Sequence, residues 1–322
     1  MNTIHQVCAN YLETCANNKN LSKHTLKAYR IDFQQFQSCI GTKIEISLID
    51  KNHILKFHNY LLNLELAPAS IKRKLVSLKA MFKWLELEEV ILVNPFNKIR
   101  TNIKLPRSLP KNVPASKLNN LIKKIKAEIG INRYEDYNAN EISSLITTKK
   151  ALNKLTTLIS IELMLCTGMR VGELASIELG SIDISGRKIK LFGKGSRERF
   201  VYLPDVESCQ LVKAYLRARS IALPTTASFL VNSRGQPAST QFIRKILREL
   251  AQRASIEIHV TPHMLRHSAA CELIESGLDI RFVQRLLGHS SISTTEIYTH
   301  VSDTLLKRKI TQAKVRKRVI KK

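Results

Sequence analysis

Four side chains toward the C-terminal end of the sequence have types and spacing that suit phosphate chemistry: His263, Arg266, His289 and Tyr298. A guanidinium binds two phosphate oxygens through its planar fork. A histidine beside a phosphate can donate a hydrogen bond or move a proton near neutral pH. A tyrosine hydroxyl can attack phosphorus and hold a covalent intermediate. These four groups predict a site for phosphoryl transfer.

Two of these side chains lie on a helix whose ends the sequence marks. Thr261 is a good N-cap, and Pro262 suits the first helical position because its missing N–H would have no helical partner there. Gly277 is a typical helix end. His263 and Arg266 are three residues apart, so they share one face of the first turns.

The other two side chains follow on shorter helices. A second helix is expected over residues 279–288, which places His289 directly after its end. Ser293 and Glu296 have the spacing of a capping box, which predicts a third short helix that carries Tyr298. One compact helical unit is therefore expected to bring two imidazoles, a guanidinium and a phenol together.

This arrangement resembles a known family. H-x-x-R at 263–266, L-G-H at 287–289 and Tyr298 nine residues after His289 are similar to the C-terminal signature of the tyrosine recombinases, the phage-integrase and Xer-type enzymes. The resemblance implies that further parts of the family's site lie upstream.

One such part is T-G-x-R-x-x-E-L at 167–174, which is similar to the family's first arginine box. The resemblance implies that Arg170 binds the scissile phosphate and that Glu173 supports it. An isolated arginine at a helix start would instead be interpreted as a surface ion pair.

A second part is a hairpin. Residues 181–203 switch to period two, with strands expected over 182–184, 188–192 and 199–203 around a tight turn at Gly193 to Ser196. The family has its catalytic lysine on this hairpin, which implies Lys194, with Lys190 and Arg197 as close alternatives. A nucleotide-binding loop is excluded because GxxxxGK[ST] is absent and GKGS leads into no helix.

The charge of the chain agrees with a phosphate-rich partner. Its 322 residues contain 52 Lys plus Arg against 26 Asp plus Glu, a formal net charge of +26. Nucleic acid is the expected partner because sequence-independent binding depends on neutralising phosphates. A solvated basic surface is the weaker alternative. A membrane is not expected, since the sequence has no basic amphipathic anchor and no long uncharged apolar run.

The cysteines and the N-terminal residues indicate the cellular compartment in which the protein is expected. Six cysteines are scattered without a CxxC pair, which favours reduced, mostly buried thiols over a disulfide framework. The first residues lack the basic-then-apolar layout of a signal peptide. A cytoplasmic protein, associated with the nucleoid in a bacterium, is therefore expected.

The N-terminal part reads as four helices, the fourth starting at Pro68 and basic along its polar side. In company with the other motifs it resembles the SAM-like core-binding domain of the integrase family. A solvated surface is the alternative for its basic face. The candidate DNA contacts on this helix are Lys72, Arg73 and Lys79.

We therefore expect a mainly α-helical fold with a small antiparallel β-hairpin or sheet (α+β), made of a SAM-like core-binding domain and a tyrosine-recombinase catalytic domain. The predicted division is a helical DNA-binding domain over 1–96, a basic proline-rich linker over 97–114, the catalytic domain over 115–312 and a basic tail over 313–322. The two domains are expected to close round a duplex, as they do in the family.

Three segments of the second domain have further expectations. Residues 128–150 look polar and irregular, as in an insert or in a segment that makes an extra contact. The helix expected over 239–254 is basic and could lie in a major groove, although a solvated face is nearly as good an interpretation. Its candidate DNA contacts are Arg244, Lys245 and Arg248. The resemblance implies that residues 301–312 dock on a neighbouring protomer, with a free tail beyond.

The resemblance implies a mechanism that needs neither metal nor cofactor: cleavage of double-stranded DNA at a specific site through a 3′-phosphotyrosyl bond, then strand exchange through a Holliday junction. A homo-tetramer, or a hetero-tetramer with a related recombinase, is the implied assembly. A zinc site is disfavoured. His263 and His267 have helical ligand spacing and His259 lies nearby, but H-E-x-x-H is absent and Arg266 would repel a cation.

Other functions remain open. A type IB topoisomerase shares the chemistry, although the two-domain layout favours a recombinase. A non-catalytic DNA-binding relative is disfavoured because Tyr298 is intact. Among recombinases, integration and excision of a mobile element is favoured over Xer-type resolution of chromosome or plasmid dimers, on account of the high charge and the segment 128–150.

Overall fold

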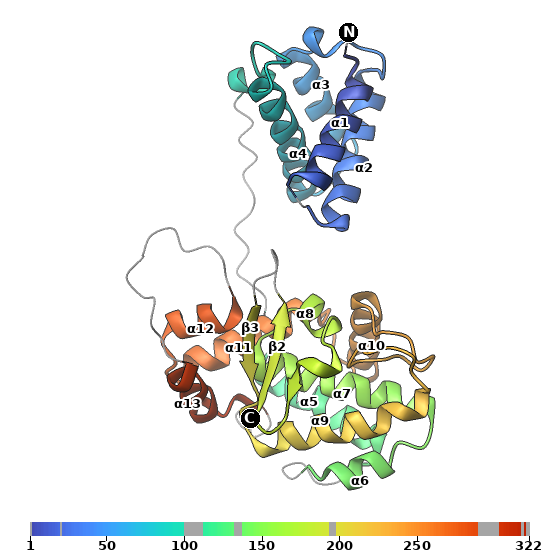
Figure 1. The fold of residues 1–322 in the computed structure, drawn as a ribbon, viewed down its shortest axis with the longest axis vertical. Coiled ribbons are helices and arrows are strands. Elements are labelled where there is room, and N and C mark those ends of the chain that lie inside the picture. Colours follow the sequence, from blue (N-terminus) through green and yellow to red (C-terminus); the bar gives the residue numbers. More distant parts are fainter. Residues whose placement is uncertain are drawn as a thin grey trace. The chain divides into compact units, whose positions relative to one another are not determined.

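The structure is a computed structural model that describes residues 2–19, 21–99, 112–131, 137–192, 198–288, 303–316 and 319 (Figure 1). The chain divides into two compact units, Met1–Ser108 and Leu109–Lys322. Both are built from helices, and the second also contains a small antiparallel sheet. The expected mainly helical α+β fold is confirmed. Within the described residues, no helix is both long and apolar enough to cross a membrane.

The N-terminal unit is a bundle of the four expected helices. They are α1 (Ile4–Asn17), α2 (Lys23–Ile40), α3 (Lys51–Asn63) and α4 (Pro68–Leu87), with short 3-10 turns at Ile46–Leu48 and Pro95–Lys98. Side chains cap the first three: Thr3, Ser22 and Asp50 each accept a hydrogen bond from a backbone N–H of the first turn. Proline at the first position starts the fourth. Because each helix buries one apolar stripe, the bundle has its own core.

The second unit is organised round α7 (Lys149–Thr167), which is buried along nearly its whole length. Four other long helices pack against it: α5 (Ala115–Ile129), α9 (Val206–Ala218), α10 (Thr240–Arg253) and α11 (Pro262–Glu275). Short helices fill the spaces between them: α6 (Ala139–Ser144), α8 (Val171–Ala175), α12 (Ile280–Leu287) and α13 (Asp303–Ala313), with 3-10 turns at Leu179–Ser181 and Arg219–Ala222. This central helix therefore fixes where α8 and α11 can present their side chains.

The sheet of the second unit has three antiparallel strands in the order β1 (Ile182–Asp183), β2 (Lys188–Phe192) and β3 (Glu198–Tyr202). Ile189 pairs with Val201, and both side chains are fully buried. The register therefore follows the period-two pattern of the sequence. The three strands were expected at these positions, with ends that differ by a residue or two. The turn that joins β2 to β3 lies outside the described residues.

Residues 137–150 differ from the irregular insert that was expected. Asn138 caps α6, which packs along α9, and Arg217 of α9 donates to the side-chain oxygen of Asn140. Tyr137, Ile142 and Ile146 are each at most 5% exposed. These apolar residues are widely spaced among polar ones, so their shared burial was hidden in the sequence. These three side chains are therefore part of the core of the second unit.

The C-terminal residues also differ from the expected free tail. Ala313, Val315, Arg316 and Val319 are buried in the second unit. Arg316 donates from Nε to Oε2 of Glu162 on α7 at 3.0 Å, with both side chains 3% exposed. The segment that follows α13 is therefore anchored in the core by an ion pair, which its basic composition concealed.

Candidate active site

The described catalytic candidates come together where α7, α8, α11 and α12 meet. Arg170 and Glu173 lie at the start of α8, His263 and Arg266 lie on the first turns of α11, and all belong to the second unit. Lys194, His289 and Tyr298, the other three predicted catalytic residues, lie outside the described residues. Their placement stays a prediction.

The turn between α7 and α8 sets the position of Arg170. Gly168 ends α7 with φ +65°, a left-handed conformation that favours glycine. A Cβ atom at this residue would also collide with the side chain of Leu287 in α12. Glycine here therefore allows the turn and the close approach of α12 that the site needs.

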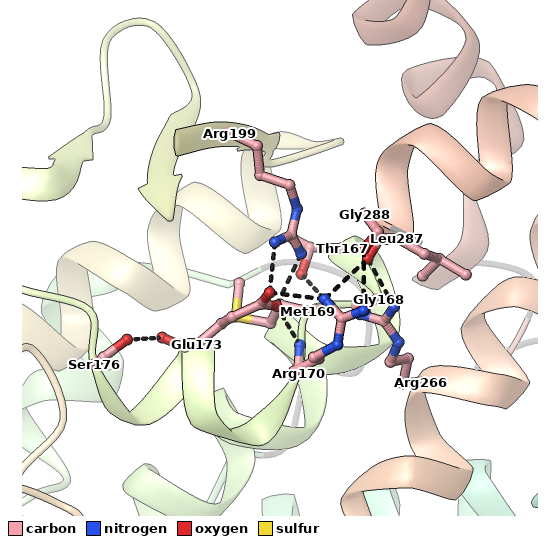
Figure 2. A network of polar contacts seen from close by, with 10 residues as sticks. All are labelled: Thr167, Gly168, Met169, Arg170, Glu173, Ser176, Arg199, Arg266, Leu287 and Gly288. Carbon is pink, nitrogen blue, oxygen red and sulfur yellow. Dashed lines mark hydrogen bonds and ion pairs between the residues drawn. The ribbon is translucent and has the colours of Figure 1, made fainter. Parts of the chain in front are cut away.

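Arg170 is held by bonds to α8 and to the end of α12 (Figure 2). Its backbone N–H donates to Oε2 of Glu173 at 2.7 Å, and its Nη1 donates to Oε1 at 3.0 Å. The guanidinium also donates to the carbonyls of Leu287, at 3.4 Å, and Gly288, at 3.0 Å. The side chain is 46% exposed, so the guanidinium still reaches solvent.

Arg266 is the buried partner of Arg170. Its Nη1 donates to the carbonyl of Gly168 at 2.8 Å and its Nη2 to the carbonyl of Leu287 at 2.7 Å. Burial, together with the nearby charge of Arg170, lowers its pKa to about 10. The guanidinium therefore remains charged near neutral pH while it ties the α7–α8 turn to α12.

Glu173 is the carboxylate at the centre of this network. Burial would raise its pKa, but hydrogen bonds from Arg199 and from the backbone of Arg170 outweigh that effect, and the pKa lies below its usual value. Arg199 of β3 contacts both carboxylate oxygens, at 2.5 and 2.8 Å. Glu173 therefore stays ionised and is shared between two arginines, as Figure 2 shows.

A cavity of about 560 Å³ opens beside these residues. Three predicted catalytic residues line it: Arg170, His263 and Arg266. Other lining residues come from α10, from the segment before α11 and from the start of α11: Gln241, Arg244, Lys245, Arg248, His259, Val260, Thr261 and Pro262. Arg170 and Arg266 therefore line the same cavity as all three DNA-contact candidates of α10. This arrangement suits a bound phosphate backbone.

Three residues at this site were not among the sequence candidates: Arg199, Gln241 and His259. Arg199 lies two residues before the buried Val201 and therefore on the same face of β3, so the period-two pattern could have shown that it points inward. Lys190, an alternative to Lys194, forms a 2.9 Å ion pair with Glu198 across the sheet.

The DNA-contact candidates of α4 lie on a helix whose basic residues differ in burial. Lys72, Arg73 and Lys79 are exposed, but Lys74 on the same helix is buried. Lys74 contacts Oδ1 of the buried Asp32 at 3.0 Å, and Arg73 contacts both of its carboxylate oxygens, at 2.5 and 2.7 Å. This carboxylate explains why one lysine of a basic helix faces the core.

The metal alternative was weighed from histidine spacing. His267 lies within 3.7 Å of Sγ of Cys271, while His263 lines the cavity. In the part of the chain that the structure describes, no group of three or more His, Cys, Asp and Glu residues is arranged to hold a metal ion. The six cysteines are free thiols, as their spacing indicated.

Comparison with known proteins agrees with this architecture. The model of the phage integrase family matches residues 135–304, and that of the phage integrase N-terminal SAM-like domain matches residues 8–89. A tyrosine recombinase of Agathobacter rectalis is 34% identical over 306 residues, which cover 94% of this chain and 94% of that protein. Tyrosine recombinase XerC of Leptospira interrogans is 33% identical over 300 residues, 92% of this chain and 88% of that protein.

The fold has counterparts among solved structures. A lambda integrase tetramer bound to a Holliday junction superposes with a TM-score of 0.65 at 17% identity, covering 91% of this chain and 76% of that one. Arg170 and Arg266, the carboxylate of Glu173 that contacts Arg170, and the two matched domains all lead to one conclusion. The chain belongs to the phage integrase family, the tyrosine recombinases.

Proposed function

We propose that this protein is a site-specific recombinase that cuts and rejoins double-stranded DNA through a 3′-phosphotyrosyl intermediate. The observation that carries the proposal is the cavity lined by Arg170, His263 and Arg266 beside the basic face of α10. In it, phosphate-binding and proton-transferring groups adjoin a surface that can follow a DNA backbone. The match of the chain to the tyrosine recombinases supports the same activity.

The charge of the site fits a pentacoordinate phosphate. Arg170, Arg199 and Arg266 surround the single carboxylate of Glu173, so the cluster has an excess of positive charge. Arg170 and Arg266 bind the non-bridging oxygens of the scissile phosphate and balance the charge that grows in the transition state. His289, from the end of α12, adds a hydrogen bond.

Tyr298 is the proposed nucleophile. Its hydroxyl oxygen attacks phosphorus while His263 accepts the phenolic proton. The bond from phosphorus to the 5′ oxygen breaks, and Lys194 donates a proton to that oxygen. The DNA 3′ end is then linked to the tyrosine, and a free 5′-hydroxyl remains. Attack of a 5′-hydroxyl from the partner duplex reverses these steps, so no external energy source is required.

The described tyrosines of the second unit support this choice. Tyr137 donates to Glu162 in the core, and Tyr215 contacts the carbonyl of Val231. Burial raises the pKa of both phenols, which makes them harder to ionise. Tyr202 is 7% exposed. None of these three lines the cavity, and each is at most 7% exposed.

The proposed assembly is a tetramer on DNA, either of identical chains or with a related recombinase. Two recombining duplexes present four strands, and each strand needs one nucleophile. The solved lambda integrase tetramer on a Holliday junction is a protein of the same fold in such an assembly. Where the DNA is the bacterial chromosome, the protein would associate with the nucleoid.

Two biological roles remain as proposals. Integration and excision of a mobile element is proposed on account of the high charge and of the segment 128–150, in which Tyr137, Ile142 and Ile146 pack in the core. Xer-type dimer resolution is favoured by the Leptospira relative named XerC, which aligns over 92% of this chain. The location of the preferred site, at a fixed chromosomal position or at the ends of an element, distinguishes the two roles.

A nicked suicide substrate tests the function. The preferred site would first be selected from random duplexes on a Tyr298→Phe protein, so that binding is retained without cleavage. Wild-type protein, in EDTA, is expected to form a covalent complex with a nicked form of this site, because the small fragment past the nick diffuses away. Tyr298→Phe is expected to form none. A complex that persists in Tyr298→Phe, or its absence from wild type, contradicts the proposal.

A further inference from the structure

We propose that Arg199 is a positioning residue for the reaction: by occupying Glu173, it keeps the guanidinium of Arg170 available to the scissile phosphate. This inference rests on the proposed function of the same site. Arg199 itself lies outside the set of phosphate-binding groups.

The contact between Arg199 and Glu173 is a sheltered, two-pronged ion pair. Nη1 donates to Oε1 at 2.5 Å and Nη2 to Oε2 at 2.8 Å. The two side chains are only 17% and 6% exposed. Parallel hydrogen bonds from a guanidinium to a carboxylate are strong and fix its orientation, and shelter from water strengthens them further. Glu173 is therefore held firmly by the strand.

The hydrogen bonds at Glu173 show what this contact does to Arg170. A carboxylate has about four acceptor positions on its two oxygens. Arg199 uses two of them, the backbone N–H of Arg170 uses a third, and Nη1 of Arg170 uses the fourth. The side chain of Arg170 therefore makes one bond to Glu173 instead of a two-pronged pair.

Loss of Arg199 would change this balance. Two acceptor positions on Glu173 would open directly beside the guanidinium of Arg170, three residues away on the same turn. An arginine and a carboxylate at that spacing can form the two-pronged pair. Arg170 would then be drawn toward α8 and its fork would be turned from the cavity. Removal of the positive charge of Arg199 would also remove a repulsion that opposes this shift.

A second contact links Arg199 to the end of α12. A Cβ atom built on Gly288 would lie 3.3 Å from Nε of Arg199, so the arginine lies directly against that glycine. The carbonyls of Leu287 and Gly288 are acceptors for Arg170, and that of Leu287 also for Arg266 (Figure 2). Arg199 is therefore in contact with both supports of Arg170, the carboxylate and the α12 end.

A double-mutant cycle distinguishes this positioning role from a direct contact of Arg199 with the scissile phosphate. Single-turnover rates of covalent-complex formation would be measured for wild type, Arg199→Gln, Glu173→Gln and the double variant, with DNA affinity measured in parallel. Arg199→Gln is expected to slow cleavage by about 10- to 100-fold, because a small misplacement of a catalytic group has effects of this size. Its DNA affinity is expected to fall no further than that of Arg170→Ala, because the contact of one guanidinium with one phosphate is lost.

The cleavage rate of the double variant distinguishes the two roles. With Glu173 already neutral, loss of Arg199 is expected to slow cleavage by less than about threefold, because the acceptor that draws Arg170 away is weakened. Arg199→Lys is expected to recover part of the rate, since an ammonium can still occupy one oxygen. Lys188→Gln, on the adjacent strand, is the matched control and should retain the wild-type rate. Equal losses from Arg199→Gln in both backgrounds would overturn the proposal.

A binding measurement tests the same inference without cleavage. In a Tyr298→Phe protein, affinity would be measured for two duplexes, one with a normal phosphate and one with an uncharged methylphosphonate at the cleaved position. The ratio of the two affinities reports the arginine contacts to that phosphate. Arg199→Gln is expected to bring this ratio close to that of Arg170→Ala. A ratio equal to that of Tyr298→Phe alone would contradict the inference. This readout holds even if wild-type protein forms no covalent complex, which would instead refute the proposed function.

Discussion

The two arginines of the site have different surroundings, and this difference shapes what each can do. Arg266 is 5% exposed and both of its described hydrogen bonds end on backbone carbonyls, so it supports the fold in addition to its proposed role in the reaction. Arg170 is half-exposed and can turn. Substitutions of Arg266 should therefore affect stability, whereas those of Arg170 should mainly affect chemistry.

The turn that carries Arg170 gives a stability prediction. Gly168→Ala is expected to destabilise the protein by about 1–3 kcal/mol, because alanine is strained at φ +65° and its Cβ would displace Leu287. Gly172→Ala is the matched control. It lies within α8 and a Cβ there meets nothing within 4 Å, so a gain of about 0.5–1 kcal/mol is expected.

Urea unfolding of the two variants checks this prediction. Opposite signs for the two substitutions would support the account of the turn. A Gly168→Ala protein as stable as Gly172→Ala would contradict the requirement for glycine at the end of α7.

For individual residues, the sequence predicted the contacts of the site where the partners are close together in the chain. Arg170 with Glu173, and His263 with Arg266, are each three residues apart, so helix geometry alone places them on one face. The pair of Arg199 and Glu173 spans 26 residues and the pair of Lys74 and Asp32 spans 42. Such contacts depend on how strands and helices pack, and no local spacing encodes them.

Among the elements, the caps and glycines made the helices predictable, but burial across elements was not. The core of the second unit contains a charged cluster in which Glu162 accepts from Tyr137 and Arg316, and Lys126 lies 4.5 Å above the Tyr137 ring. The charged residues Lys126 and Arg316 gave no sign of burial in the sequence. Their apolar neighbours on α5, α6 and the C-terminal segment were needed to show it.

This cluster predicts a pH dependence of stability. Burial lowers the pKa of Lys126 to about 8, with Glu162 opposing and Arg316 adding to that effect, against an ordinary value of 10.5. Between these two pH values the unfolded chain keeps a proton that the folded chain has released. The contribution of Lys126 to stability therefore rises with pH in this window, by at most about 1.4 kcal/mol per pH unit.

Lys126→Met provides the comparison. The free energy of unfolding of wild type minus that of the variant is expected to be flat below about pH 8 and to increase toward about pH 10. Urea unfolding at several pH values measures it. A difference that stays constant, or falls, over this range would contradict the burial of a charged lysine beside Arg316.

The basic face of α10 gives a prediction about DNA. Arg244 and Arg248 are exposed and line the cavity beside Arg170. Substitution of either by alanine is expected to weaken binding and to reduce the slope of log affinity against log salt by about 1. Lys213→Ala, an exposed lysine of α9 away from the cavity, is the control and should leave the slope unchanged. Equal slopes for all variants would contradict a phosphate-binding role for α10.

For the whole molecule, two features of the sequence led to the same function before the fold was considered. The net charge of +26 indicated nucleic acid, and the spacing of the arginines, histidines and tyrosine indicated phosphoryl transfer. The family match then covers both domains. The segment 128–150 was expected to be irregular because most of its residues are polar. Its buried side chains, among them Tyr137, Ile142 and Ile146, determine how the described part of it packs.

The identity of the residue bonded to DNA is the most direct test of the account. After cleavage of a nicked site, trypsin and nuclease digestion would leave a nucleotide on one peptide, which mass spectrometry can sequence. We predict that the remnant lies on Tyr298, within the peptide that extends from residue 286 to 307, and is joined through its 3′ phosphate. A remnant on another residue, or one joined through a 5′ phosphate, would contradict the account.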